Sequence, residues 1–240
     1  MQTLPPCKPI LAMIAAAFVS ACVTVAPPSE PLPEPRAPTA DRISTSNAIS
    51  NYRSAVAQVE PVAESLCRQR SQDVNCDFLI QIDPDPNAPP NAFQSLSPSG
   101  RPVLTFTRAL IAQARNQDEI AFVVGHESAH HIEQHIARQR RSAATGALVG
   151  GLIASVAGAD TNTVNEVSRI SAGVGARRFS KDHELEADAL GTIITARAGY
   201  DPIRGSAFFT RIPDPGNRFL GTHPPNADRI DVVRRTAAGL

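Results

Sequence analysis

The sequence predicts a mainly helical α+β domain with a small antiparallel sheet. Long stretches at residues 41–70 and 108–141 carry apolar residues at helical spacing. Between them lie three short runs of β-forming residues, separated by proline and glycine. We therefore expect the sheet to lie beside the helix that carries residues 125–135, where four of the six histidines are found.

The individual elements follow from the same patterns. Residues 41–70 predict one or two helices, and residues 108–141 predict two helices that break near Asn116–Asp118. Asp118 is the expected N-cap of the second of these. The predicted strands are DFLIQID (77–83), NAFQSL (91–96) and RPVLTFT (101–107). The intervening SPSG (97–100) predicts a hairpin turn between the last two strands.

The N-terminus reads as an export signal. Residues 1–21 combine positive charge with an apolar core at residues 10–19, which is shorter than the roughly 20 residues that span a bilayer. The ending VSAC (19–22) resembles the bacterial lipobox, which implies acylation of Cys22. Val23 after the cysteine favours the outer over the inner membrane. An ordinary signal with a chance cysteine is the alternative.

The next segment predicts a tether. Residues 22–40 are rich in proline, which favours an extended, semi-rigid spacer over a helix or a central strand. The folded domain is therefore expected over residues 41–240.

The remaining cysteines predict a disulfide. With Cys22 acylated, Cys67 and Cys76 form an even pair in a compartment that would be oxidising. Two unpaired, buried thiols are the alternative.

Composition argues against some partners. The chain has 23 basic and 23 acidic residues, no tryptophan and 5% aromatic residues, which disfavours nucleic acid or an anionic membrane surface. Residues 143–159 are small and apolar, and could form a membrane helix or helices packed over the core. Packing over the core is favoured because the run is short and rich in glycine.

A metal site is indicated by GHESAHHIEQH (125–135). His126 and His130 are four residues apart, so on a helix both can face one metal ion at about 2.0–2.1 Å. Glu127 lies too far round the helix to be a ligand, but it can act as general base on a water that zinc activates.

A third ligand is offered by FSKDHELEADALG (179–191). Glu184 and Asp188 are four residues apart and share a helical face, whereas Glu186 falls on another. Glu184 would complete a His-His-Glu set that leaves one position open. Without the first motif, an exposed acidic helix would be the better reading.

Both motifs resemble those of the gluzincin family that contains the CAAX prenyl protease, HtpX and the BepA and LoiP lipoprotein proteases. Further matching segments occur in the family order: NAF (91–93), RPVLTFTRAL (101–110), AGYDP (198–202) and THPPNADRI (222–230). The resemblance covers roughly residue 51 to the end. It implies a zincin-like metalloprotease domain.

The resemblance also implies residue roles. It gives one zinc ion per chain, bound by His126, His130 and Glu184, with Glu127 as the catalytic base. Asp188 matches a residue that orients the site or donates a proton. His223 matches a histidine that approaches the metal or the oxyanion, although a structural loop histidine is an equal alternative.

The other histidines receive weaker roles. His135 fits a recurrent family histidine but is not expected to be a fourth ligand, and His131 and His183 are expected at the surface. The family's usual Ser-Arg is Ser180–Lys181 here, so a contact there would be made differently.

The expected function is that of a zinc metalloendopeptidase, lipid-anchored in a bacterial envelope and facing the periplasm. Its substrates would be polypeptides, including unassembled outer-membrane proteins. A substrate would pair with a strand edge at residues 101–106, and the glycine-rich segment after Arg141 would cover the cleft. The alternative is a chaperone-like lipoprotein whose zinc site is closed by His223. Metal storage fits poorly because the ligands are few.

Overall fold

A computed structural model describes residues 45–71, 73–178, 180–214 and 224–240. The export signal, Cys22 and the tether lie outside the described residues, as does His223. The described residues form one compact unit.

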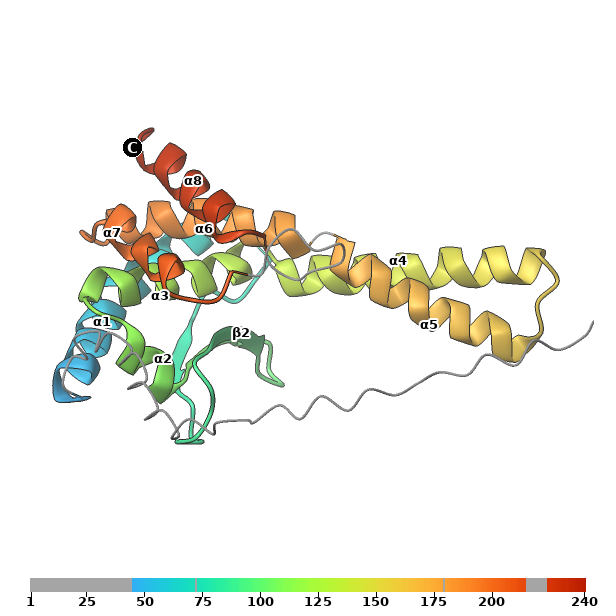
Figure 1. The fold of residues 1–240 in the computed structure, drawn as a ribbon, viewed down its shortest axis with the longest axis horizontal. Helices are drawn as coiled ribbons and strands as arrows, with labels where there is room; N and C mark the ends of the chain where they lie inside the picture. Colours follow the sequence, from blue (N-terminus) through green and yellow to red (C-terminus); the bar gives the residue numbers. More distant parts are fainter. Residues whose placement is uncertain (1–44, 72, 179, 215–223) are drawn as a thin grey trace, which may run out of the picture. The chain divides into compact units, whose positions relative to one another are not determined.

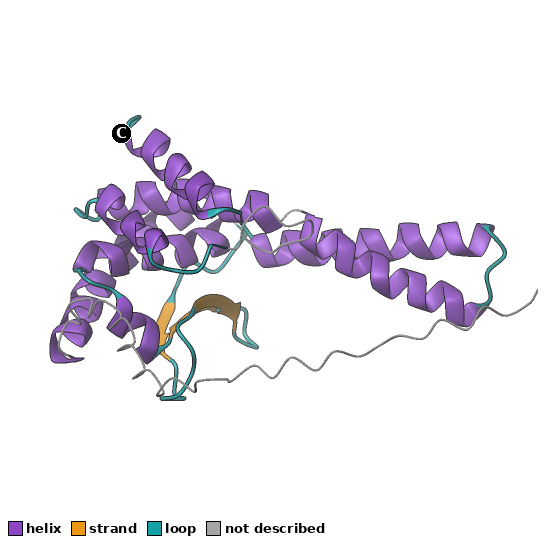
Figure 2. Ribbon diagram, viewed as in Figure 1, coloured by secondary structure: helices purple, strands orange, loops and turns teal. Residues whose placement is uncertain are grey.

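The predicted mainly helical fold is confirmed (Figures 1 and 2). Its helices are α1 (Thr45–Arg70), α2 (Arg108–Gln113), α3 (Gln117–Ile132), α4 (His135–Val156), α5 (Thr161–Arg178), α6 (Ser180–Arg197), α7 (Pro202–Ser206), the 3-10 helix η1 (Ala207–Thr210) and α8 (Asn226–Ala237). The first predicted region is a single helix, because α1 continues through Pro61.

The sheet is mixed rather than antiparallel. It consists of β1 (Leu79–Ile82), β2 (Ala92–Leu96) and β3 (Pro102–Phe106), in the order β1-β3-β2. The predicted hairpin joins β2 and β3, but β1 runs parallel to β3. The proline-rich connection after β1 makes no tight turn. It carries the chain to the far side of β3, so β2 rather than β1 pairs antiparallel with β3.

Helix α3 is the centre of the domain. It packs against α1, α6, α7 and β2, and nearly all of its residues are buried. The sequence causes this, because IAFVV is followed by small residues at positions 125, 128 and 129 that admit neighbours on every side. The histidine-rich motif at residues 125–135 therefore lies largely on the most enclosed helix of the described structure.

Helix α3 begins two residues earlier than predicted. The cap is Asn116, whose side chain accepts a hydrogen bond from the Glu119 backbone N–H at 3.0 Å. Asp118 lies in the first turn instead and accepts from the backbone N–H of Asp201 at 2.9 Å. Its carboxylate also pairs with Arg204, so Asp118 links α3 to α7.

The glycine-rich segment does not pack over the core. Helices α4 and α5 form a hairpin and pack against each other (Figure 1). Leu148, Leu152 and Val156 of α4 are 74%, 66% and 81% exposed. No described helix is both long and apolar enough to cross a membrane. The prediction failed because glycines and serines of the two helices face each other, which leaves the larger apolar side chains outside.

Candidate active site

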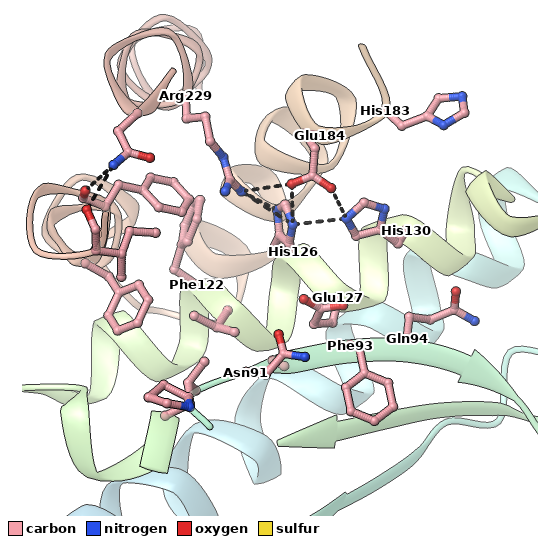
Figure 3. Close-up of a pocket in the computed structure, with 18 of the residues that line it drawn as sticks. Asn91, Phe93, Gln94, Phe122, His126, Glu127, His130, His183, Glu184 and Arg229 are labelled. Carbon is pink, nitrogen blue, oxygen red and sulfur yellow. Dashed lines mark hydrogen bonds and ion pairs between the residues drawn. The ribbon is translucent and has the colours of Figure 1, made fainter. Parts of the chain in front are cut away.

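Two helices bring three metal-binding side chains together. His126 and His130 come from α3 and Glu184 from α6 (Figure 3). The two histidine Nε2 atoms are 3.0 Å apart, and carboxylate oxygens of Glu184 lie 3.4 Å from His130 Nε2 and 3.6 Å from His126 Nε2. A tetrahedral ion with bonds of 2.0–2.1 Å separates its ligand atoms by about 3.3 Å. The three donors therefore fit a zinc-like ion.

Close backbone contact between α3 and α6 sets this geometry. A Cβ atom on Gly125 would lie 2.9 Å from the Gly191 carbonyl oxygen, and one on Gly191 would lie 2.9 Å from the His126 nitrogen. Neither distance is compatible with a side chain. The two glycines therefore let the ligand helices touch next to His126.

Asp188 orients His126 through a hydrogen bond from the ring nitrogen that faces away from the metal position. Its carboxylate is fully buried, and its Oδ1 accepts a hydrogen bond from His126 Nδ1 at 2.9 Å. This bond leaves the Nε2 lone pair of His126 free to face the metal position. Asp188 is not among the residues that line the cleft. The geometry therefore suits the orienting role expected of Asp188 better than that of a proton donor.

Arg229 of α8 is a site residue that sequence reasoning missed. Its guanidinium makes two hydrogen bonds of 2.7 Å to Asp188 and lies 3.6 Å from Glu184. It also stacks over the Phe209 ring at 3.9 Å. Burial opposes both charges, but their mutual attraction wins: the pKa of Asp188 is lowered and that of Arg229 is raised. The sequence feature that could have indicated Arg229 is its place in THPPNADRI, where it is the one lysine or arginine.

His135 supports the second ligand. The chain leaves α3 through Gln134, a non-glycine residue with φ 53°, and this turn brings His135 back toward His130. The Nδ1 atoms of the two histidines are 2.8 Å apart, and His135 Nε2 lies 3.1 Å from Glu186. Burial and the neighbouring His130 lower the pKa of His135 to about 3, which keeps the ring neutral.

Glu186 anchors this arrangement from the other face of α6, as its predicted separation from Glu184 requires. Arg138 of α4 donates hydrogen bonds to both of its carboxylate oxygens. Mainly because of the bonds from Arg138, the pKa of Glu186 is lowered to about 2.

The prediction that His131 and His183 lie at the surface is wrong. They are 7% and 6% exposed. His131 Nε2 donates to the Asn75 carbonyl at 2.7 Å, and His183 stacks on His135 with ring centroids 4.4 Å apart. His131 is enclosed because α3 is covered on almost all sides, so its helical position there gives no access to solvent.

The expected disulfide supports the same region. The structure joins Cys67 and Cys76, whose Cα atoms are 5.7 Å apart. This bond ties the end of α1 to the segment that carries Asn75. The partner of His131 is thus held covalently near the motif helix.

A cleft of about 860 Å³ opens over the ligands. One wall holds His126, Glu127, His130 and Glu184, and the other holds Ala92, Phe93 and Gln94 of β2 (Figure 3). Strand β2 is at the edge of the sheet, whereas β3 is its centre. The expectation of a free edge at residues 101–106 is therefore wrong, since both sides of that strand are already paired.

The comparisons with known proteins agree with this site. The family model described as Peptidase family M48 matches residues 55–237. The chain therefore belongs to peptidase family M48, as the resemblance to gluzincins predicted.

Named relatives include bacterial and mitochondrial proteases. A Vibrio cholerae protein that bears the name of a beta-barrel assembly-enhancing protease is 33% identical over 53% of this chain and 29% of its own length. The beta-barrel assembly-enhancing protease of Escherichia coli is 29% identical over 54% of this chain and 29% of its own. The mitochondrial metalloendopeptidase OMA1 of Saccharomyces cerevisiae is 32% identical over 65% and 46%. The chain thus spans less than half the length of these relatives.

Proposed function

We propose that this chain is a zinc-dependent metalloendopeptidase that cleaves polypeptides in a bacterial cell envelope. The observation that carries the proposal is the placement of Glu127 beside His126, His130 and Glu184 in one cleft, opposite an edge strand. The donor set fits zinc, because two imidazoles and one carboxylate leave a fourth position open. A bound zinc ion would supply Lewis acidity, which activates water and polarises a carbonyl group.

The protein's own residues supply substrate binding and proton transfer. A polypeptide can lie along β2 and pair with its backbone, which presents a scissile carbonyl to the opposite wall. Glu127 takes the proton of the attacking water and delivers it to the leaving amine. Asp188 and His135 hold the ligand rings His126 and His130 in register for this step.

The location in the envelope rests on the N-terminal sequence and on the relatives. Residues 1–21 and the lipobox ending at Cys22 favour export and a lipid anchor in the outer membrane, facing the periplasm. The bacterial relatives are named for assembly of β-barrel proteins, which favours unassembled outer-membrane proteins as substrates. The OMA1 relative is named a mitochondrial metalloendopeptidase, which supports the proposed activity.

The test is cleavage of a permanently unfolded protein by the full chain in detergent, with zinc and with a chelator. Glu127→Gln should abolish cleavage and still bind one zinc ion. The matched control is Glu166→Gln, an exposed glutamate of α5, which should cleave normally. One tightly bound zinc without cleavage would favour the chaperone-like protein with a closed site. Cleavage by Glu127→Gln would exclude Glu127 as the base.

A further inference from the structure

The α4–α5 hairpin exposes an unusual amount of apolar surface. The large apolar side chains of this hairpin that are at least 40% exposed are Leu148, Val149, Leu152, Ile153, Val156, Ile170 and Val174. Contiguous apolar surface of this kind commonly marks an interaction site.

Small residues force these side chains outward. A Cβ atom on Gly146 would lie 2.3 Å from the Ser171 carbonyl oxygen, and one on Gly175 would lie 2.3 Å from the Ser142 carbonyl oxygen. The two helices thus meet backbone to backbone. Apolar side chains that would fill the interface of an ordinary helix pair are left free for another partner.

Part of this surface is concave. A groove of about 680 Å³ lies between the helices, with Val149, Ile153 and Val174 along it and Arg138 and Arg141 toward one end. From residue 138 to residue 153, α4 rises about 22 Å at 1.5 Å per residue. An extended polypeptide covers that length with about six or seven residues at roughly 3.3 Å each.

The groove lies next to the active-site cleft. His183, at the start of α6, lines both the groove and the cleft that contains Glu127 and His130. A chain bound along β2 can therefore extend past His183 into the groove. Leu148 and Leu152 are exposed but do not line the groove, so a bilayer would meet them instead.

We propose that the α4–α5 groove binds an extended, apolar segment of the polypeptide substrate, next to the segment that is cleaved. The inference rests on the proposed endopeptidase function and deepens it. Folded proteins bury such segments, whereas unfolded chains expose them. The groove therefore selects unfolded polypeptides before the active site acts on them.

The test compares three fluorogenic peptides that share one cleavage sequence. The short peptide fills only the cleft, and two long peptides add seven residues of alternating valine and serine, one at the N-terminal end and the other at the C-terminal end. Ile153→Asp and Val149→Asp, in the groove, should lower the long-to-short ratio of kcat/KM about tenfold or more, because each removes an apolar contact. The matched controls Leu148→Asp and Leu152→Asp should keep the wild-type ratio. Circular dichroism of each variant checks the fold.

Two further measurements separate the possible failures. Fluorescence anisotropy of the labelled long peptides on Glu127→Gln measures binding without cleavage, so it tests the groove even if no peptide is cut. An equal loss in groove and control variants, or no loss in either, would overturn the proposal. In a Cys22→Ser background, which lacks the proposed lipid anchor, sedimentation with phosphatidylethanolamine–phosphatidylglycerol vesicles that all four variants abolish, at an unchanged peptide ratio, would assign the hairpin to a membrane instead.

Discussion

His130 and His135 share a short hydrogen bond between their Nδ1 atoms, at 2.8 Å. Because His130 offers Nε2 to the metal position, its proton must lie on Nδ1, and His130 donates to His135. His135 then carries its own proton on Nε2 and donates to Glu186. The chain of bonds fixes both tautomers and holds the second ligand from the start of α4.

Replacement of His135 should therefore weaken metal binding. We expect His135→Phe to lower zinc affinity about 10- to 100-fold, because loss of the hydrogen-bond partner of a metal-binding histidine commonly has an effect of this size. Competition with a chromophoric chelator measures this. The matched control is His183→Phe, which keeps a ring stacked on His135 and should leave the affinity within about twofold. Equal affinities in the two variants would remove His135 from this role.

Arg229 should stabilise the folded protein as well as hold Asp188 in the site. Arg229→Met leaves the fully buried Asp188 without its cationic partner, while the bond from His126 Nδ1 remains. Removing one partner of a buried ion pair typically costs about 3–5 kcal/mol. Urea unfolding of the metal-free protein measures the loss. The double variant Arg229→Met with Asp188→Asn should recover part of it, because no unpaired charge remains. A loss below about 1 kcal/mol in the single variant would contradict the buried pair.

The contact between Gly125 and Gly191 predicts that one substitution lowers both the stability of the protein and its zinc affinity. In Gly191→Ala the new Cβ meets the His126 backbone, so α3 and α6 must separate. We expect about 1–3 kcal/mol lower stability and weaker zinc binding, since the ligands come from both helices. Thermal unfolding and chelator competition measure the two effects.

The control for this variant is another helical glycine. A Cβ atom on Gly173 of α5 would meet nothing within 4 Å. Gly173→Ala should stabilise the protein by about 0.5–1 kcal/mol and leave zinc binding as it is. If both alanine variants bind zinc like the wild type, the helix contact does not set the site.

The link from α3 to α7 predicts a dependence of stability on pH. Burial opposes the charge of Asp118, but bonds from Arg204 and the Asp201 backbone outweigh it, so its pKa is lowered in the folded state. Its stabilisation is therefore complete above the unfolded pKa of about 3.9 and lost as pH falls through the folded value. Asp118→Asn should lower stability at pH 6 by about 1–2 kcal/mol and less at pH 3.

Urea midpoints at the two pH values test this prediction. The control is Asp231→Asn, which removes an exposed i,i+4 pair with Arg235 and should change stability by less than about 0.5 kcal/mol. A loss in Asp118→Asn that is equal at pH 3 and pH 6 would show that its charge is not the cause.

Two of the three candidate ligands could be predicted from local geometry, because His126 and His130 share a helical face by spacing alone. Glu184 lies on another helix, and its spacing from Asp188 made it a candidate that the resemblance then supported. Arg229 could not be found in this way, since its contact with Asp188 depends on how α8 packs on α6. The same holds for His135, whose role follows from the turn at Gln134.

In the fold, too, features set by local sequence could be predicted, whereas features set by long-range contacts could not. Helix α1, the break between α2 and α3 and the three strands were predicted from periodicity, and the hairpin from SPSG, but the second break, at Gln134 between α3 and α4, was not. Strand order was not, because no local pattern shows that β3 separates β1 from β2. Burial of His131 was missed for a similar reason: composition does not reveal that α3 is covered by neighbours on almost every side.

The direct contact of α3 and α6 frees the chain between them to vary. The ligand helices are positioned by Gly125 and Gly191, and the α4–α5 hairpin lies between them in sequence. Lengthening such an interval costs little, about 0.6 kcal/mol of closure entropy for each doubling of a flexible loop. The part of the hairpin beyond Arg138 can thus vary in length, whereas His135 and Arg138 at the start of α4 must stay to hold His130 and Glu186.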